Sequence, residues 1–106
     1  MRELRNDNTL KYFVTNITKQ IGKNCKKIIL FGSRARGDDT EESDYDFLIV
    51  VSEVSPQLKN TIDSLCGEIL FQYNKVFSVV IISEEKYVQQ IYNPLLINIR
   101  KEGKPL

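Results

Sequence analysis

Two aspartates, Asp44 and Asp46, stand one residue apart at the start of the apolar segment 45–51. If that segment is a strand, residues two positions apart point to the same side, so both carboxylates face one place. Paired carboxylates on a rigid strand suit Mg²⁺, which takes one or two protein carboxylates and completes its shell with water and phosphate oxygens. The spacing therefore predicts a divalent metal site at the beginning of this strand.

A second group of residues, directly upstream, is typical of phosphate binding. Gly32 and Ser33 follow the apolar run 28–31, and Arg34 and Arg36 come next. Glycine lets a phosphate approach the backbone closely, and backbone N–H groups, a hydroxyl and positive charge can hold it there. A phosphate cradle beside a metal-binding acid pair provides the two halves of a site for in-line transfer at a nucleoside triphosphate.

An acidic segment joins the two groups, and the alternative to a functional role for it is an ordinary solvated surface loop. An acidic loop alone, or a D-x-D pair alone, is most often a solvated surface feature. The combination favours a function, because Gly-Ser, arginine, glycine, an acidic turn and Ser-Asp-x-Asp follow one another between two strands. We expect the other acids of the segment to be a solvated surface that adds negative potential: Asp38, Asp39, Glu41 and Glu42.

The hydrophobic pattern predicts the elements that must position these residues. Apolar residues recur every three or four positions in segments 8–24 and 55–74, which predicts two amphipathic helices, the second with Ser55 as N-cap and Pro56 at its first position. Strands are predicted at 26–31, 45–51 and 75–83. Another helix is expected from Ser83 through about Tyr92, and a last short helix ends at Gly103. This order predicts a small mixed α/β sheet flanked by helices.

The composition indicates one globular domain over residues 1–106. The net charge is +1, with 42% hydrophobic and 27% charged residues, so nucleic acid is not implied as a partner. No apolar run approaches the roughly 20 residues of a membrane span. The chain has no histidine, and Cys25 and Cys66 lack metal-ligand spacing, so we expect reduced thiols and no zinc site. These features predict a cytoplasmic protein without a membrane partner.

The central stretch, GSRARGDDTEESDYDFLIV, resembles the G-S-x-A-R-G and S-D-x-D signature of the nucleotidyltransferase superfamily with the DNA polymerase β fold. In size the chain is similar to the minimal nucleotidyltransferase domain proteins of prokaryotes. The resemblance implies that fold, Mg²⁺ as cofactor, and ATP or another nucleoside triphosphate as substrate. Minimal proteins of this kind often form the antitoxin half of a toxin–antitoxin pair, and some place AMP on a tyrosine of a helical partner toxin.

The resemblance also implies a role for each motif residue. Asp44 and Asp46 would be the catalytic, Mg²⁺-coordinating acids. Ser43, grouped with the nucleotide-binding residues, would most simply cap the turn that aims them. The other motif residues would bind the nucleotide, with the two arginines either lying close to it or bracing the loop: Gly32, Ser33, Arg34 and Arg36.

One position departs from the family pattern. Active members carry a third carboxylate on the next long strand, and the aligned position here, in KVFSVVIIS, is Ser78. A hydroxyl can neither act as the general base nor bridge a second metal ion with full charge. Glu84 and Glu85 lie too far along an extended chain to substitute. We expect Ser78 to face the two acids, and Phe77 and Val79 to point into the core.

Two functions of different classes follow from these features. The first is Mg²⁺-dependent transfer of a nucleotidyl group, AMP from ATP, to a hydroxyl of a partner protein. The second is a nucleotide-binding or partner-binding module of the same fold that turns over little because of Ser78. Transfer to a drug hydroxyl of the aminoglycoside type is disfavoured, since 106 residues leave no second domain for an acceptor pocket.

Overall fold

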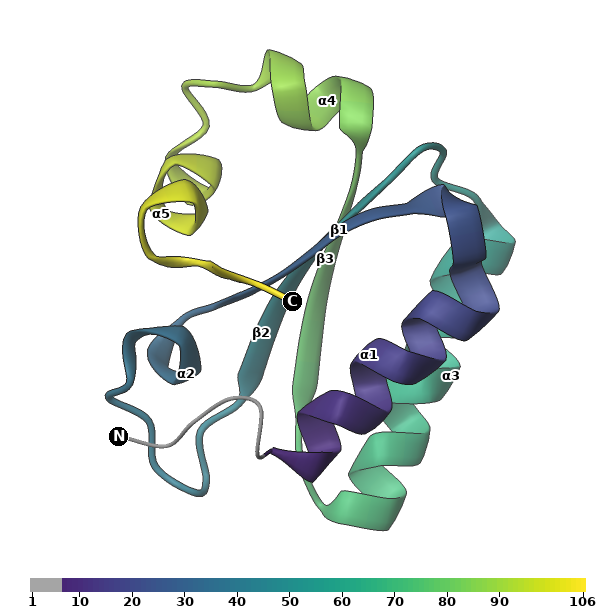
Figure 1. Ribbon diagram of the computed structural model, residues 1–106, viewed down its shortest axis with the longest axis vertical. Helices are drawn as coiled ribbons and strands as arrows, with labels where there is room; N and C mark the ends of the chain where they lie inside the picture. Colours follow the sequence, from purple (N-terminus) through teal and green to yellow (C-terminus); the bar gives the residue numbers. More distant parts are fainter. Residues whose placement is uncertain (1–6) are drawn as a thin grey trace.

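A four-stranded mixed sheet separates two layers of helices (Figure 1). The computed structural model describes residues 7–106. The strands are β1 (Cys25–Phe31), β2 (Tyr45–Val51), β3 (Phe77–Ser83) and β4 (Lys104–Pro105), in the spatial order β3-β2-β1-β4. On one side lie α1 (Asn8–Ile21) and α3 (Pro56–Tyr73), and on the other α4 (Glu84–Gln89) and α5 (Pro94–Glu102). The predicted class, a small mixed sheet flanked by helices, is confirmed.

The strand directions bring three distant chain segments to one corner. β1 and β2 are antiparallel and are joined through the short helix α2 (Ser33–Arg36) and the acidic segment, whereas β3 runs parallel to β2 after the α3 crossover. The end of β1 therefore lies beside the start of β2 and the start of β3. β4 completes the sheet by pairing antiparallel with β1.

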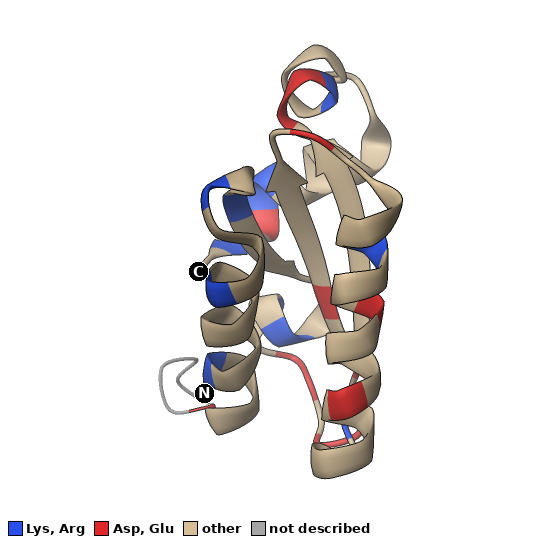
Figure 2. Cartoon of the chain, turned by 90° about the vertical axis from the view of Figure 1, so that its right-hand side faces the viewer, with Lys and Arg blue, Asp and Glu red and all other residues tan. Residues whose placement is uncertain are grey.

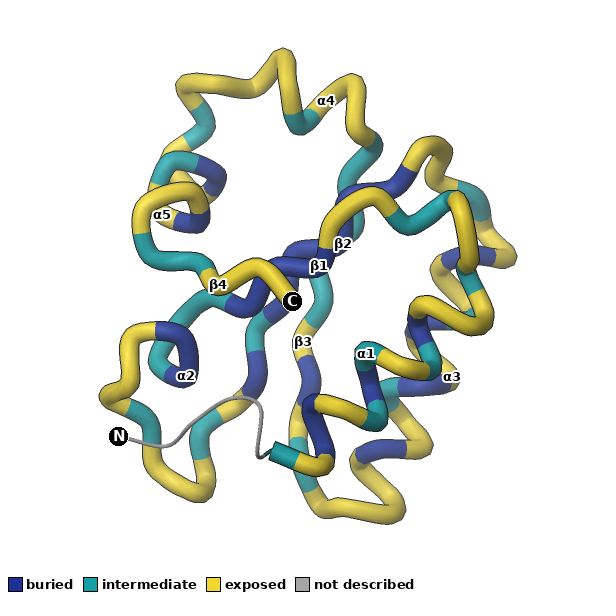
Figure 3. The backbone as a smooth tube through the Cα atoms, viewed as in Figure 1, coloured by how far each residue is buried: buried dark blue, intermediate teal, exposed yellow. Residues whose placement is uncertain are grey.

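Strand β2 is the centre of the core, and Figure 3 shows it buried between the helical layers. Alternate residues face opposite layers, as the pleat requires. One face of the sheet packs against α1 and α3, where aromatic rings from three elements meet: Phe13, Tyr45, Phe47 and Phe77. The opposite face packs against α5 through a smaller cluster: Ile29, Leu48, Val50, Leu96 and Ile99.

Helix caps explain where the helices begin. Ser55 accepts a hydrogen bond from the Leu58 N–H at 3.1 Å, with Pro56 at the first helical position as predicted. The Asp7 carboxylate caps α1 in the same way, and the Asn93 side chain caps α5. The helix after β3 also begins as expected, with Ser83 as its cap.

The structure differs from the prediction at the shortest elements. The helix predicted to reach about Tyr92 ends at Gln89, β3 begins at Phe77 rather than at residue 75, and α2 and β4 were not predicted. α2 has four residues and β4 two, too few for a hydrophobic period to be visible. Within residues 7–106, every helix is too short or too polar to cross a membrane.

Candidate functional site

Gly32, Asp46 and Ser78 meet where β1 ends and where β2 and β3 begin. Asp46 pairs with Phe31 on one side, directly before Gly32, and with Ser78 on the other. In a parallel pair, residues in register point to the same face. Phe77 is buried and Val79 packs against the α1–α3 core, so the expectation that Ser78 faces away from that core and toward Asp46 is confirmed. Ser78 itself is exposed.

Glycine is required at position 32 for two separate reasons. Its backbone has φ 76° and ψ −160°, a conformation that residues with a Cβ rarely adopt. A Cβ built at this position would lie 2.5 Å from Oδ2 of Asp46. The backbone at the end of β1 therefore lies directly against one of the two acids, with no side chain between them.

The two aspartates interact electrostatically. Asp44 is exposed and Asp46 is half-buried. Burial raises the pKa of the Asp46 carboxyl above its ordinary value, the Asp44 carboxylate raises it further, and the Arg36 guanidinium lowers it. The two carboxylates are therefore close enough to repel each other, as a pair sharing one cation would be.

The donor set at this corner fits a hard divalent ion. Two carboxylates, that of Asp46 in β2 and that of Asp44 just before β2, match the small number of protein ligands that Mg²⁺ usually takes, and the Asp44 side is open to water. Among residues 7–106, no three His, Cys, Asp or Glu side chains gather closely enough to hold a metal ion. Glu84 and Glu85 begin α4 at the opposite end of β3, so they do not complete the pair.

Arg36 supplies exposed positive charge beside the acids. Its Nε donates to Asp38 at 3.2 Å and its Nη1 donates to Glu102 of α5 at 3.2 Å. The hydrogen bond to Asp38 is the main reason why the pKa of Arg36 is raised. Ser33, the first residue of α2, is half-buried between Gly32 and the arginines. Arg36 is thus exposed to solvent, and Ser33 is partly so.

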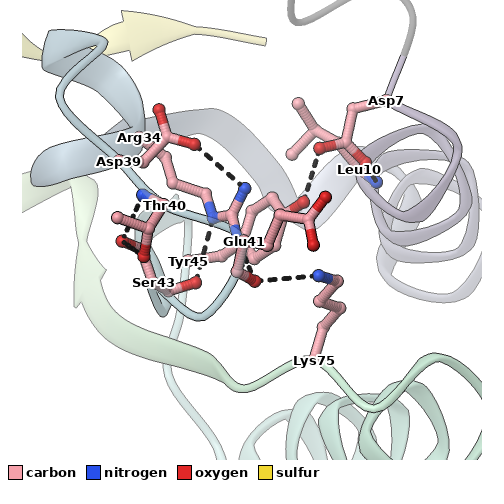
Figure 4. Close-up of polar contacts among 9 residues, drawn as sticks. All are labelled: Asp7, Leu10, Arg34, Asp39, Thr40, Glu41, Ser43, Tyr45 and Lys75. Atoms are coloured by element: carbon pink, nitrogen blue, oxygen red, sulfur yellow. Dashed lines mark hydrogen bonds and ion pairs between the residues drawn. The ribbon is translucent and has the colours of Figure 1, made fainter. Parts of the chain in front are cut away.

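Arg34 is in a different environment from Arg36, because its side chain is only 2% exposed. It donates from Nε to the Ser43 carbonyl at 3.0 Å, from Nη2 to the Glu41 carbonyl at 3.1 Å, and from Nη1 to Asp39 at 3.2 Å (Figure 4). Its guanidinium also lies 4.0 Å from the centre of the Tyr45 ring. Of the two roles expected for this arginine, these contacts are those of a brace.

The acidic segment is thus only partly the solvated surface that was expected. That expectation was wrong for Asp39, whose side chain is 13% exposed because it pairs with the buried Arg34. The segment lies at the lower end of the molecule in Figure 2, as red stretches of the connection between α2 and β2. Asp38 does remain exposed, as do the side chains of Glu41 and Glu42.

Two further contacts close this loop. Ser43 accepts a hydrogen bond from the Thr40 N–H at 2.9 Å and its own N–H donates to the Thr40 carbonyl at 3.1 Å, so the predicted capping of the turn is confirmed. Lys75, just before β3, donates to the Glu41 carbonyl at 2.9 Å. Sequence reasoning missed Lys75 and Asp39, since neither pairing follows a local spacing.

Three comparisons bear on what this corner does. Residues 14–106 match the family model described as "Nucleotidyltransferase domain". Over 103 residues the chain is 39% identical to a protein of Methanocaldococcus jannaschii named "Putative protein adenylyltransferase", covering 97% of this chain and 99% of that one. A crystal structure of a mutant of the toxin–antitoxin pair MntA–HpeT matches with a TM-score of 0.64 at 19% identity, covering 91% of this chain and 69% of that one.

A second solved structure, of a toxin–antitoxin with AMP-PNP, matches with a TM-score of 0.61 at 15% identity. It covers 93% of this chain and 72% of that one. At these identities the two structures show a shared fold. Together with the family match they confirm the fold that the central motif implied.

Proposed function

This chain belongs to the nucleotidyltransferase domain family, and on that basis we propose that it transfers AMP from ATP to a hydroxyl group of a partner protein. The observation that carries the proposal is the contact of Gly32 with Asp46, beside Asp44. It sets a strand end with no side chain, where a triphosphate could lie, directly against a pair of carboxylates. Phosphate and metal would then be held by neighbouring atoms of one hairpin.

The chain's own residues would divide the work as follows. Asp44 and Asp46 would hold Mg²⁺, which when bound neutralises negative charge on phosphate oxygens. Gly32 and Ser33 would hold phosphate oxygens through backbone N–H groups and a hydroxyl. Arg36 would add positive charge, exchanging its exposed contacts with acids for the phosphates.

The transfer replaces a phosphoanhydride bond of ATP with a phosphate ester bond to the acceptor. The acceptor oxygen bonds to the α-phosphorus of ATP, the bond from that phosphorus to the oxygen bridging to the β-phosphate breaks, and pyrophosphate leaves. The acceptor hydroxyl gives up its proton. Ser78 cannot take that proton as a carboxylate would, so the base in this proposal is a water molecule or a group of the acceptor.

A protein acceptor is supported by the proteins to which this chain is similar. The similar protein of Methanocaldococcus jannaschii is named "Putative protein adenylyltransferase", and the two solved structures described above come from toxin–antitoxin systems. We therefore propose a cytoplasmic toxin, encoded by a neighbouring gene, as the acceptor.

The proposal is tested by incubating the chain with ATP labelled at the α-phosphate, Mg²⁺ and the product of the neighbouring gene. We expect label on the partner protein, and its loss when Asp44 and Asp46 are both replaced by asparagine. Asp63→Asn, an exposed acid on α3, is the control and should transfer normally. Equal labelling by the double variant and the native chain would refute the metal-binding role of the pair.

A second candidate function is favoured by the register of Asp46 with Ser78. With a hydroxyl at the position where active members carry a third acid, the chain would bind nucleotide or partner and turn over little. Ser78→Asp distinguishes the two functions, because a general base typically contributes about 10² to 10⁴ in rate. A large gain in transfer supports the binding module, whereas no gain over an already rapid native protein excludes it.

A further inference from the structure

The buried guanidinium of Arg34 joins α2 to the turn that carries the acids. All three of its hydrogen-bond acceptors lie in residues 39–43, and two of them are backbone carbonyls. An arginine this deeply buried is tolerated only when its donors are satisfied. The planar guanidinium donates to three oxygens at once, and a lysine ammonium cannot donate to all three with the same geometry. The turn is therefore fastened along its length by one side chain.

The guanidinium of Arg34 also stacks on a buried residue of the core. Tyr45 is 2% exposed, and its ring lies under Arg34 at 4.0 Å. Its hydroxyl donates to Asp7, whose other carboxylate oxygen caps α1 at the Leu10 N–H (Figure 4). Arg34 thus connects the turn to β2 and, through Tyr45, to the start of α1.

These contacts fix both chain neighbours of Asp44. The carbonyl of Ser43, on one side, accepts from Arg34 Nε, and the ring of Tyr45, on the other side, lies under the same guanidinium. Asp44 itself lies just outside β2 and is exposed, so within residues 7–106 no sheet pairing sets its direction. The direction of its side chain therefore depends on how its two neighbours are held.

We propose that Arg34 is a positioning residue, which holds the acidic turn so that the Asp44 carboxylate stays beside that of Asp46. The inference rests on the proposed function, because it assigns Arg34 to the metal-binding half of the same site. Of the two roles that the sequence left open for Arg34, it takes the brace and not the nucleotide ligand, since a side chain 2% exposed offers no surface to a phosphate. Arg36 is exposed and its charge acts on the pKa of Asp46, so the role of nucleotide ligand stays with Arg36.

The test compares Arg34→Met and Arg34→Lys with Arg100→Met. Arg100 is a matched control, because it also donates to a backbone carbonyl, that of Tyr87, and lies 4.4 Å from the centre of the Tyr87 ring, but in the α4–α5 layer. Calorimetric titration with ATP is done with and without Mg²⁺. Supporting residues of metal sites typically contribute about 10- to 100-fold in affinity.

We expect both Arg34 variants to lose roughly 10- to 100-fold of the Mg²⁺-dependent affinity and to keep the Mg²⁺-independent part. The control should keep both. If Arg34 had a merely structural role, its loss would weaken the Mg²⁺-dependent and the Mg²⁺-independent affinity together, or Arg34→Lys would bind as the native chain does. Either result overturns the proposal. If Arg34→Met does not fold, Asp39→Asn, which keeps an acceptor oxygen at an intermediate position, should show the same selective loss to a smaller degree.

Amide hydrogen exchange separates this inference from the proposed function. The Thr40 and Ser43 N–H groups are bonded within the turn, so Arg34→Met should speed their exchange and Arg100→Met should not. If the native chain shows no Mg²⁺-dependent affinity for ATP, the proposed function fails. If the Thr40 and Ser43 amides also exchange at the native rate in Arg34→Met, then Arg34 does not hold the turn either. Unchanged Mg²⁺-dependent affinity in a folded Arg34→Met chain overturns the proposal directly.

Discussion

Replacement of Gly32 by alanine separates the backbone requirement at this position from its contact with Asp46. The backbone conformation, φ 76° with ψ −160°, belongs to a region that is almost confined to glycine, and a side chain there costs about 1–3 kcal/mol. The new methyl group would also lie 2.5 Å from Asp46 Oδ2, closer than real Cβ contacts, so the carboxylate must move. Alanine should therefore affect both stability and metal binding.

Gly22 provides the control for the first effect alone. Its backbone is in a similar conformation, φ 63° with ψ −132°, and a Cβ there would meet nothing within 4 Å. Both alanine variants should lose about 1–3 kcal/mol, which for a domain of this size lowers the melting temperature by about 5–15 °C. Circular dichroism during thermal unfolding measures this loss.

The second effect appears only in nucleotide binding. Calorimetry should show that Gly32→Ala loses roughly 10-fold or more of the Mg²⁺-dependent affinity for ATP, whereas Gly22→Ala binds as the native chain does. Equal affinities for the two variants would refute the inference that the end of β1 holds Asp46 in place. A loss in both would indicate that general destabilisation, rather than the contact, controls binding.

Three other expectations concern stability and reactivity. The raised pKa of Asp46 means that the folded chain holds this proton more tightly than the unfolded chain, so the free energy of unfolding falls as pH rises from about 3.8 through the raised pKa. Asp46→Asn should therefore melt at a higher temperature than the native chain at pH 7. In thermal scans across pH, this difference should vanish below pH 3.8. Ser55→Ala removes the cap of α3 and should cost about 1 kcal/mol in urea unfolding, with an unchanged midpoint contradicting the assigned cap. Burial, with a contribution from Asp63, raises the pKa of Cys66 to about 11. Because only the thiolate reacts, alkylation of Cys66 at pH 8 should be roughly 100-fold slower in the folded chain than in urea. Comparable rates in the two conditions would contradict its burial.

The elements that the sequence predicted best are those whose signals are local. After Asp46, β2 is a run of apolar residues buried on both faces, and α3 carries a cap, a proline at its first position and an apolar stripe. The pairing of β4 could not be predicted, because Lys104 and Pro105 are ordered by β1, far away in the sequence. Such a short strand has no pattern of its own.

At the site, the sequence identified the acids and the glycine but not what holds them. Gly32 and Asp46 are visible because glycine and a D-x-D pair carry chemical meaning at fixed spacing. The burial of Arg34 is not visible, since nothing in GSRARG distinguishes a guanidinium that folds under the acidic turn from one that faces solvent. Whether the Arg34 guanidinium is buried depends on the backbone path of residues 39–43, which supply its three acceptors.

The topology of the sheet also has a consequence for the order in which the corner assembles. Gly32 directly follows β1, and Asp46 belongs to the neighbouring antiparallel strand β2. Ser78 lies on β3, which pairs with β2 only after the long α3 crossover. Pairing between distant segments is slower than local pairing, because more chain entropy is lost before contacts form. We expect the acid-bearing hairpin to form early in refolding and β3 to dock late, so substitutions at Ser78 should change the unfolding rate more than the folding rate.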